Sequence, residues 1–156
     1  MKEAVNQADS PKAIGLASDH AGYKLKQFIK SVLDKKSLAY IDFGTDSEIS
    51  CSYTGPGHLL ADAIEKGKAY PGIAICGSGN GINITVNKHA GIRSALCWCP
   101  EIAWLARSHN DANILALPGR FLSENDAKEI LEIFLNTPFE GGRHQTRIDA
   151  IPLITC

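Results

Sequence analysis

The chain has 156 residues, 44% of them hydrophobic, which suits one domain with a full core. Its 16 basic and 17 acidic side chains leave a net charge of −1, so the overall field does not favour nucleic acid as a partner. No run approaches the roughly 20 apolar residues of a membrane span. Five cysteines without a zinc-type Cys-x-x-Cys favour a reduced, cytoplasmic protein.

Short β-rich runs alternate with helical patterns after a polar segment, residues 1–12, that predicts a flexible leader. In chain order, the patterns predict a strand at 13–17, a helix at 23–33, a strand at 38–43, a helix at 58–68, a strand at 72–76, a short helix at 82–88, a strand at 93–97, a helix at 100–108, a strand at 114–117, a helix that Ser123 opens and that runs to 135, and a last helix after Gly141-Gly142. Residues 13–156 are therefore expected to form one doubly wound, Rossmann-like α/β domain on a five-stranded parallel sheet.

Ligands in such sheets lie beyond the carboxyl ends of the strands. The segments expected to meet there are Ser18-Asp19-His20, Gly44-Thr45, Cys76 to Gly81, and Gly119-Arg120. They bring carboxylate, imidazole, thiol and guanidinium groups to one edge, which indicates an enzyme active site. The lysines of the first helix are instead expected on a solvated face: Lys24, Lys26, Lys30, Lys35 and Lys36.

The strongest single signal is the stretch Ile73 to Gly81, in which an apolar strand runs into a loop with glycine at positions 77, 79 and 81. Glycines leave the backbone open to a ligand, and successive N–H groups can converge on an anion. Cys76 ends the strand beside them, so a base would lie next to donors that stabilise the negative charge it creates. The loop lacks the Lys-Ser/Thr of a P-loop and the spacing of a dinucleotide fingerprint.

Other interpretations of these residues stay open. Cys76 could be core packing, because cysteine is often buried. Asp19 could cap the next helix, and His20 could be an exposed loop residue. His109-Asn110-Asp111 lies between a helix and a strand, and it could be only a polar turn.

Arg143 and Arg147 are four apart on the last predicted helix, so they project from one face. Their guanidinium forks suit phosphate oxygens, and a glycine-led helix start could add donors. A tolerated surface pair of arginines is the alternative.

Five ordered motifs together resemble the ribose-5-phosphate isomerase B family, which includes the subunits of galactose-6-phosphate isomerase. The motifs are Ser18-Asp-His-Ala-Gly22, Cys76-Gly-Ser-Gly-Asn-Gly81, Asn87-Lys-His-Ala-Gly-Ile-Arg93, Ser108-His-Asn-Asp-Ala-Asn113 and Glu140-Gly-Gly-Arg-His-Gln-Thr-Arg147. The resemblance covers nearly the whole chain after the leader. It implies interconversion of ribose 5-phosphate and ribulose 5-phosphate. No set of His, Cys and carboxylate residues shows metal-ligand spacing in the sequence, and the reaction needs no redox cofactor, so no cofactor is expected. A hexose 6-phosphate isomerase and a non-catalytic nucleotide-binding module are the alternatives.

The resemblance also implies a role for each site residue. Cys76 would move the proton between C1 and C2, Ser78 would help transfer protons on the substrate oxygens, and His109 would open the sugar ring. The remaining expected contacts are the backbone of Gly77, Gly79, Asn80 and Gly81 to the enediolate, Asp19 and Asn110 to sugar hydroxyls, and His20, Arg120, Arg143 and Arg147 to the phosphate.

One segment departs from the family pattern of Asp-Tyr-Pro followed by a helix, since here it reads Ser52-Tyr-Thr-Gly-Pro-Gly-His58. Tyr53 is still expected to face the substrate. His109 is expected at the opposite end of the sheet from Cys76, and a strand of about five residues spans ~17 Å. A homodimer with shared active sites, alone or as a dimer of dimers, would bring the two residues together.

Overall fold

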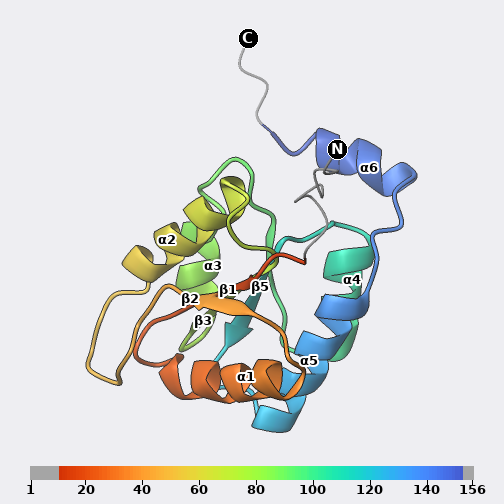
Figure 1. The fold of residues 1–156 in the computed structure, drawn as a ribbon. Coiled ribbons are helices and arrows are strands. Elements are labelled where there is room, and N and C mark those ends of the chain that lie inside the picture. Colours follow the sequence, from red (N-terminus) through yellow and green to blue (C-terminus); the bar gives the residue numbers. More distant parts are fainter. Residues whose placement is uncertain (1–10, 153–156) are drawn as a thin grey trace, which may run out of the picture.

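The computed structural model describes residues 11–152, so most of the expected leader and the last four residues lie outside it (Figure 1). A five-stranded sheet has the order β2-β1-β3-β5-β4, and every neighbouring pair is parallel. The strands are β1 (Ile14–Ser18), β2 (Tyr40–Asp42), β3 (Gly72–Cys76), β4 (Ser94–Leu96) and β5 (Ile114–Pro118). The helices are α1 (Tyr23–Lys35), α2 (Thr54–Glu65), α3 (Asn80–Val86), α4 (Pro100–Ser108), α5 (Glu124–Asn136) and α6 (Arg143–Asp149). The predicted α/β fold class is confirmed.

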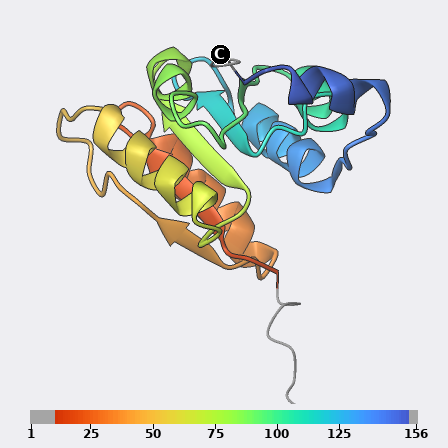
Figure 2. The same ribbon diagram turned by 90° about the horizontal axis from the view of Figure 1, so that it is seen from above.

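Helices cover both faces of the sheet, and the two faces carry side chains of different size (Figures 1 and 2). Large aliphatic residues such as Ile73, Ile75 and Leu117 pack against α1, α4 and α5. Small residues such as Ala17 and Ala74 face α2 and α3. Because side chains alternate along a strand, Cys76 points to the second face, with Ala74.

The second helix begins at Thr54, not at His58 as predicted, and it ends at Glu65. Gly55, Pro56 and Gly57 therefore lie inside it. Proline is tolerated in a first turn because its missing N–H would have no helical partner there. A Cβ atom at position 57 would lie 3.3 Å from Ile82 Cγ1, so this glycine lets α2 pack closely on α3.

The expectation of a fully solvated lysine face on α1 is wrong for Lys26, which is completely buried. Its ammonium group donates to Asp42 Oδ1 at 2.6 Å and to the carbonyl oxygen of Thr45. Lys30 donates to the other carboxylate oxygen of Asp42 at 3.1 Å. Burial lowers the pKa of Lys26, although the partner Asp42 opposes this effect. The network fixes the Gly44-Thr45 loop beside the end of β1.

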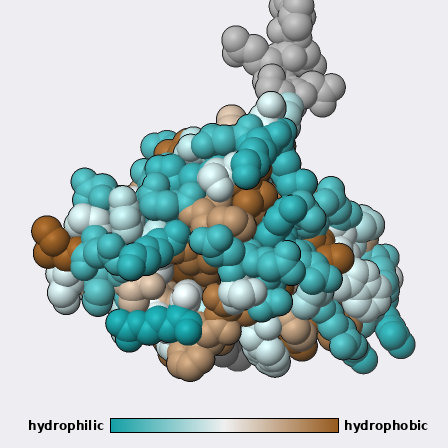
Figure 3. Space-filling view, turned by 90° about the horizontal axis from the view of Figure 1, so that it is seen from below, coloured by the Kyte–Doolittle hydropathy of each residue, from teal (hydrophilic) through white to brown (hydrophobic). Residues whose placement is uncertain are grey.

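Hydrophilic residues dominate the face seen from below, and hydrophobic residues show between them in smaller areas (Figure 3). Among the helices within residues 11–152, none combines the length and the apolar character needed to cross a membrane.

Candidate active site

The loop after β3 is shaped by its backbone. The N–H of Gly79 donates to the carbonyl oxygen of Cys76 at 3.2 Å, and Gly79 has φ +76°, a conformation that favours glycine. A Cβ atom there would lie 2.4 Å from Leu96 Cδ1. The Ser78 hydroxyl accepts the N–H of Asn80 at 3.3 Å. The loop therefore turns sharply from Cys76 into α3.

Several amides of this loop remain free to bind a ligand. The N–H groups of Gly77, Ser78, Gly81 and Ile82 donate to no acceptor within residues 11–152. The last two belong to the first turn of α3, whose donors have no helical partner. The residue Cys76 is 3% exposed, and it ends the strand that leads into these donors.

Two side chains from other segments border the loop. Tyr53 lies against Gly81, because a Cβ atom at position 81 would be 2.4 Å from Tyr53 Cζ. Arg120 lies over Gly77, because a Cβ atom at position 77 would be 3.4 Å from Arg120 Nη1. The backbone N–H of Arg120 also donates to the carbonyl oxygen of Gly77. Tyr53 is therefore brought to the glycine loop despite the altered sequence around it.

Asp19 and His20 follow β1 at the same end of the sheet. The N–H of Asp19 donates to the carbonyl oxygen of Ile75, and its carboxylate accepts the N–H of Gly22 at 2.9 Å. This carboxylate thus fixes the turn before α1, as the capping alternative expected. Nδ1 of His20 accepts the N–H of Cys51 at 3.2 Å in one tautomer, which leaves Nε2 for a ligand.

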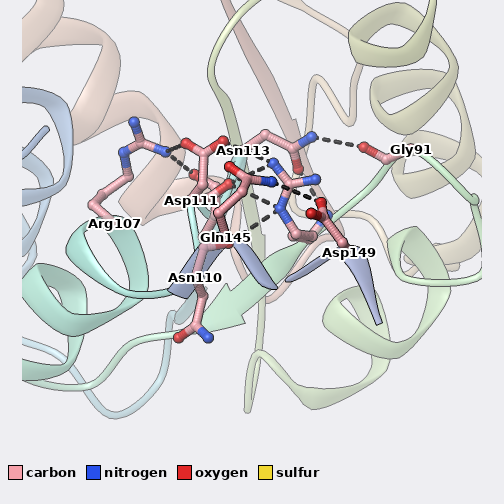
Figure 4. Close-up of polar contacts among 9 residues, drawn as sticks. Gly91, Arg107, Asn110, Asp111, Asn113, Gln145 and Asp149 are labelled. Carbon is pink, nitrogen blue, oxygen red and sulfur yellow. Dashed lines mark hydrogen bonds and ion pairs between the residues drawn. The ribbon is translucent and has the colours of Figure 1, made fainter. Parts of the chain in front are cut away.

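The segment 109–113 is held by side chains at the other end of the sheet (Figure 4). Nε of Arg93 donates to the carbonyl oxygens of Asn110 and Asp111, both at 3.1 Å. The carboxylate of Asp111 pairs with Arg93 and Arg107 at 3.0 and 2.8 Å. Asn113 accepts the N–H of Arg93 and donates to the carbonyl oxygen of Gly91. The side chain of Asn110 points away from this network.

His109 caps the end of α4 and forms a cluster with residues near α6. Its ring stacks on that of His144, with centroids 4.1 Å apart and planes 11° apart. Glu140 Oε2 lies 4.0 Å from His109 Nε2 and 3.6 Å from His144 Nε2. Burial and His109 lower the pKa of His144, together with Arg143 and Arg147. The exposed Arg143 and Arg147 lie on the same helix as His144.

The donor atoms of His109, Glu140 and His144 lie within 4.8 Å of one another, and two imidazoles with a carboxylate are donors that can bind a metal ion. The sequence analysis did not predict this cluster. Its sequence signal was the spacing of Glu140 and His144, four apart. A metal lies in the plane of each imidazole that binds it. The nearly parallel rings of His109 and His144 have no common in-plane point, so one of them would have to turn.

The expected site residues therefore fall into two groups. Asp19, His20, Tyr53, Arg120 and the segment 76–81 meet beyond the carboxyl ends of β1, β3 and β5. His109, Asn110, Arg143 and Arg147 lie beyond the amino ends, because Asn113 precedes β5 and bonds to Gly72, which begins β3. Cys76 pairs instead with Pro118, the last residue of β5. One chain does not bring the four expected phosphate ligands together.

Known proteins resemble the chain along almost its whole length. It is 41% identical over 143 residues to ribose-5-phosphate isomerase B of Escherichia coli, covering 92% of this chain and 96% of that protein. A ribose 5-phosphate isomerase from Thermotoga maritima superposes with a TM-score of 0.87 at 46% identity, over 88% of this chain and 95% of that one. The ribose-5-phosphate isomerase B of Mycoplasma genitalium, solved with bound ribulose-5-phosphate, superposes with a TM-score of 0.84 at 38% identity, over 89% of this chain and 93% of that one. The family model described as Ribose/Galactose Isomerase matches residues 14–151, and the chain belongs to that family.

Proposed function

We propose that the chain interconverts ribose 5-phosphate and ribulose 5-phosphate through an enediolate, with Cys76 as the base. The observation that carries this proposal is the position of Cys76, at the end of β3 and directly before the free amides of the loop. The names of the relatives support the choice of substrate. An aldose–ketose conversion removes a proton from carbon next to a carbonyl, so it needs a base and donors for the oxyanion.

In the proposed mechanism, His109 first opens the sugar ring by moving a proton between the anomeric hydroxyl and the ring oxygen. The Cys76 thiolate then takes the proton from C2 of the aldose and returns it to C1. Meanwhile the free amides of the loop share the enediolate charge, and Ser78 relays protons between the two substrate oxygens. Preorganised donors of this kind commonly supply the largest single catalytic contribution.

The proposed site is shared between two chains of a homodimer. The position of His109 and Arg143 beyond the amino ends of the strands supports this arrangement, because Cys76 and Arg120 lie at the carboxyl ends. A twofold interface would give each site one group of residues from each chain. The free thiols of Cys51, Cys76, Cys97 and Cys99 support a reducing compartment such as the cytoplasm.

The direct test is to incubate the protein with ribose 5-phosphate and follow ribulose 5-phosphate by NMR. Galactose 6-phosphate and a nucleotide serve as parallel ligands for the two alternatives. We expect conversion of the pentose and a smaller kcat/KM for the hexose. Binding of the nucleotide without conversion of either sugar would reject the proposal.

Mixed dimers test the shared site. Cys76→Ala and His109→Ala variants, each inactive, are unfolded and refolded together. Some heterodimers then carry one intact site, so part of the parental activity should return. Heterodimers proved by mass spectrometry that remain inactive would place both residues in the same chain.

A further inference from the structure

His144 is a buried titratable side chain that the proposed mechanism does not use. Its side chain is 6% exposed, while that of His109 is 31% exposed. Nε2 of His144 has no hydrogen-bond partner within residues 11–152. The positive φ angles of Gly141 and Gly142 set the turn that places His144, at the start of α6, over the ring of His109.

Three contacts fix the relation between the two rings. They stack at 4.1 Å between centroids, and Trp104 packs against His109 with its ring tilted by 62°. The N–H of Glu140 donates to the carbonyl oxygen of Ser108 at 3.0 Å, which ties the loop before α6 to the end of α4. His109 is thus held between Trp104 and His144.

We propose that His144 is a positioning residue for His109: it supports one face of that imidazole and stays neutral, so that the stacked pair carries one proton and carries it on His109. The inference rests on the proposed role of His109 in opening the sugar ring. A proton donor and acceptor works only when its own protonation is defined, and a second charge on the neighbouring ring would disturb it.

The surrounding charges decide which ring takes the proton. Two positive imidazoles at this distance repel each other, so the first proton opposes the second. Burial disfavours charge on His144 more than on His109, and the nearby Arg143 and Arg147 act in the same direction. Glu140 faces both Nε2 atoms, at 3.6 Å from His144 and 4.0 Å from His109, and it opposes the lowering of the His144 pKa without reversing it.

An NMR titration of the imidazole carbons tests the proton assignment without any assay of activity. In the wild-type protein, His144 should be the second ring of the pair to take a proton as the pH falls, because burial and its positive neighbours lower its pKa. In His109→Phe the titration of His144 should move to higher pH, because the repulsion is gone. Protonation of His144 first, or an identical titration of His144 in both proteins, would overturn the proposal.

Kinetics test the positioning role. His144→Ala removes the ring and should lower kcat for ribose 5-phosphate by about tenfold or more, with KM nearly unchanged, since small displacements of a catalytic group are costly. His144→Phe restores a stacking ring without a titratable nitrogen, so it should recover most of the loss. His58→Ala, a histidine on α2 that bonds to His89, is the matched control and should have no effect.

A second substrate separates positioning from general damage. The 5-oxygen of ribulose 5-phosphate carries the phosphate, so this ketose cannot close a furanose ring, and exchange of its C1 proton with D2O needs Cys76 but no ring opening. His144→Ala should leave that exchange nearly unchanged. Equal loss of exchange and conversion, or no rescue by His144→Phe, would overturn the inference. A wild-type protein that does neither reaction would reject the proposed function, while the titration would still decide the protonation.

Discussion

At the carboxyl end of the sheet, the segment 76–81 is shaped by glycines and backbone hydrogen bonds, and Ser78 supplies the one side-chain hydrogen bond found within it. At the amino end, the segment 109–113 is held by the side chains of Arg93, Arg107 and Asp111. The two ends are built differently because the groups that they offer to a ligand differ: backbone amides at the first end and a histidine side chain at the second. A donor surface for an oxyanion needs open backbone, whereas an acid/base histidine needs a scaffold. Apart from the reactive thiol of Cys76, the first end should be damaged by added atoms, and the second end by removed atoms.

The largest expected effect is at Cys76. Cys76→Ala should lower kcat by ~10² to 10⁴, as for loss of a general base, while the melting temperature changes little. Cys97→Ala is the matched control. Burial raises the pKa of Cys97 to about 12, so its thiol is not a base near neutral pH. A Cys76→Ala enzyme that keeps half of its activity would refute the assignment.

Added atoms at the glycine loop can be tested with Gly79→Ala. The positive φ and the overlap with Leu96 should together cost about 2–5 kcal/mol of unfolding free energy. Gly141→Ala has a similar φ of +68° but open space around its Cβ, so it should cost only about 1–2 kcal/mol. Urea unfolding measures both variants. Equal costs would show that packing at Gly79 contributes nothing.

Removal of atoms at the amino end can be tested with Arg143→Ala and Arg147→Ala. Each would delete a charge-assisted contact to the phosphate, worth about 1.5–3 kcal/mol, so KM should rise roughly tenfold to a hundredfold. kcat should fall less, because the phosphate is bound in both ground and transition states. Lys24→Ala, an exposed lysine on α1, is the control. An unchanged KM would make the two arginines a surface pair.

A smaller effect concerns the loop beside β1. Burial alone would raise the pKa of Asp42, but hydrogen bonds from Lys26, Gly44 and Lys30 outweigh it and lower that pKa. The stabilisation is therefore present above the unfolded pKa of about 3.9 and is lost as the pH falls through the lower folded value. Asp42→Asn should cost about 1–3 kcal/mol at pH 7. The difference from wild type should narrow in acid, and a constant difference down to pH 2 would contradict this account.

The smallest expected effect is that of metal removal. The His109 and His144 rings are stacked nearly parallel and cannot both direct a lone pair at one ion. Dialysis against EDTA should therefore leave the rate unchanged. Activity that is lost and then restored by one divalent ion would show that a ring turns to bind it.

The sequence predicted those features that depend on adjacent residues. Helix α4 has the predicted bounds because Pro100 starts it, and Ser123 caps α5 by accepting the N–H of Asp126 at 3.1 Å. The glycine loop was also predictable, since its strand, thiol and glycines are contiguous.

Distant contacts account for what the sequence did not predict. The start of α2 depends on the packing of Gly57 against α3. This packing outweighs the low helix propensity of glycine and proline. Lys26 is buried because Asp42 and Thr45 receive its protons from another segment. The cluster of His109, Glu140 and His144 joins two segments that a linear pattern cannot relate.

The strand order has a consequence for assembly. The outer strands β2 and β4 have three residues each, whereas the three inner strands have five. Short outer strands offer few unpaired backbone groups to a neighbouring chain, which is one way in which proteins avoid edge-to-edge aggregation. A second copy would therefore associate through helices and loops, and the sheet would not extend from one molecule to the next.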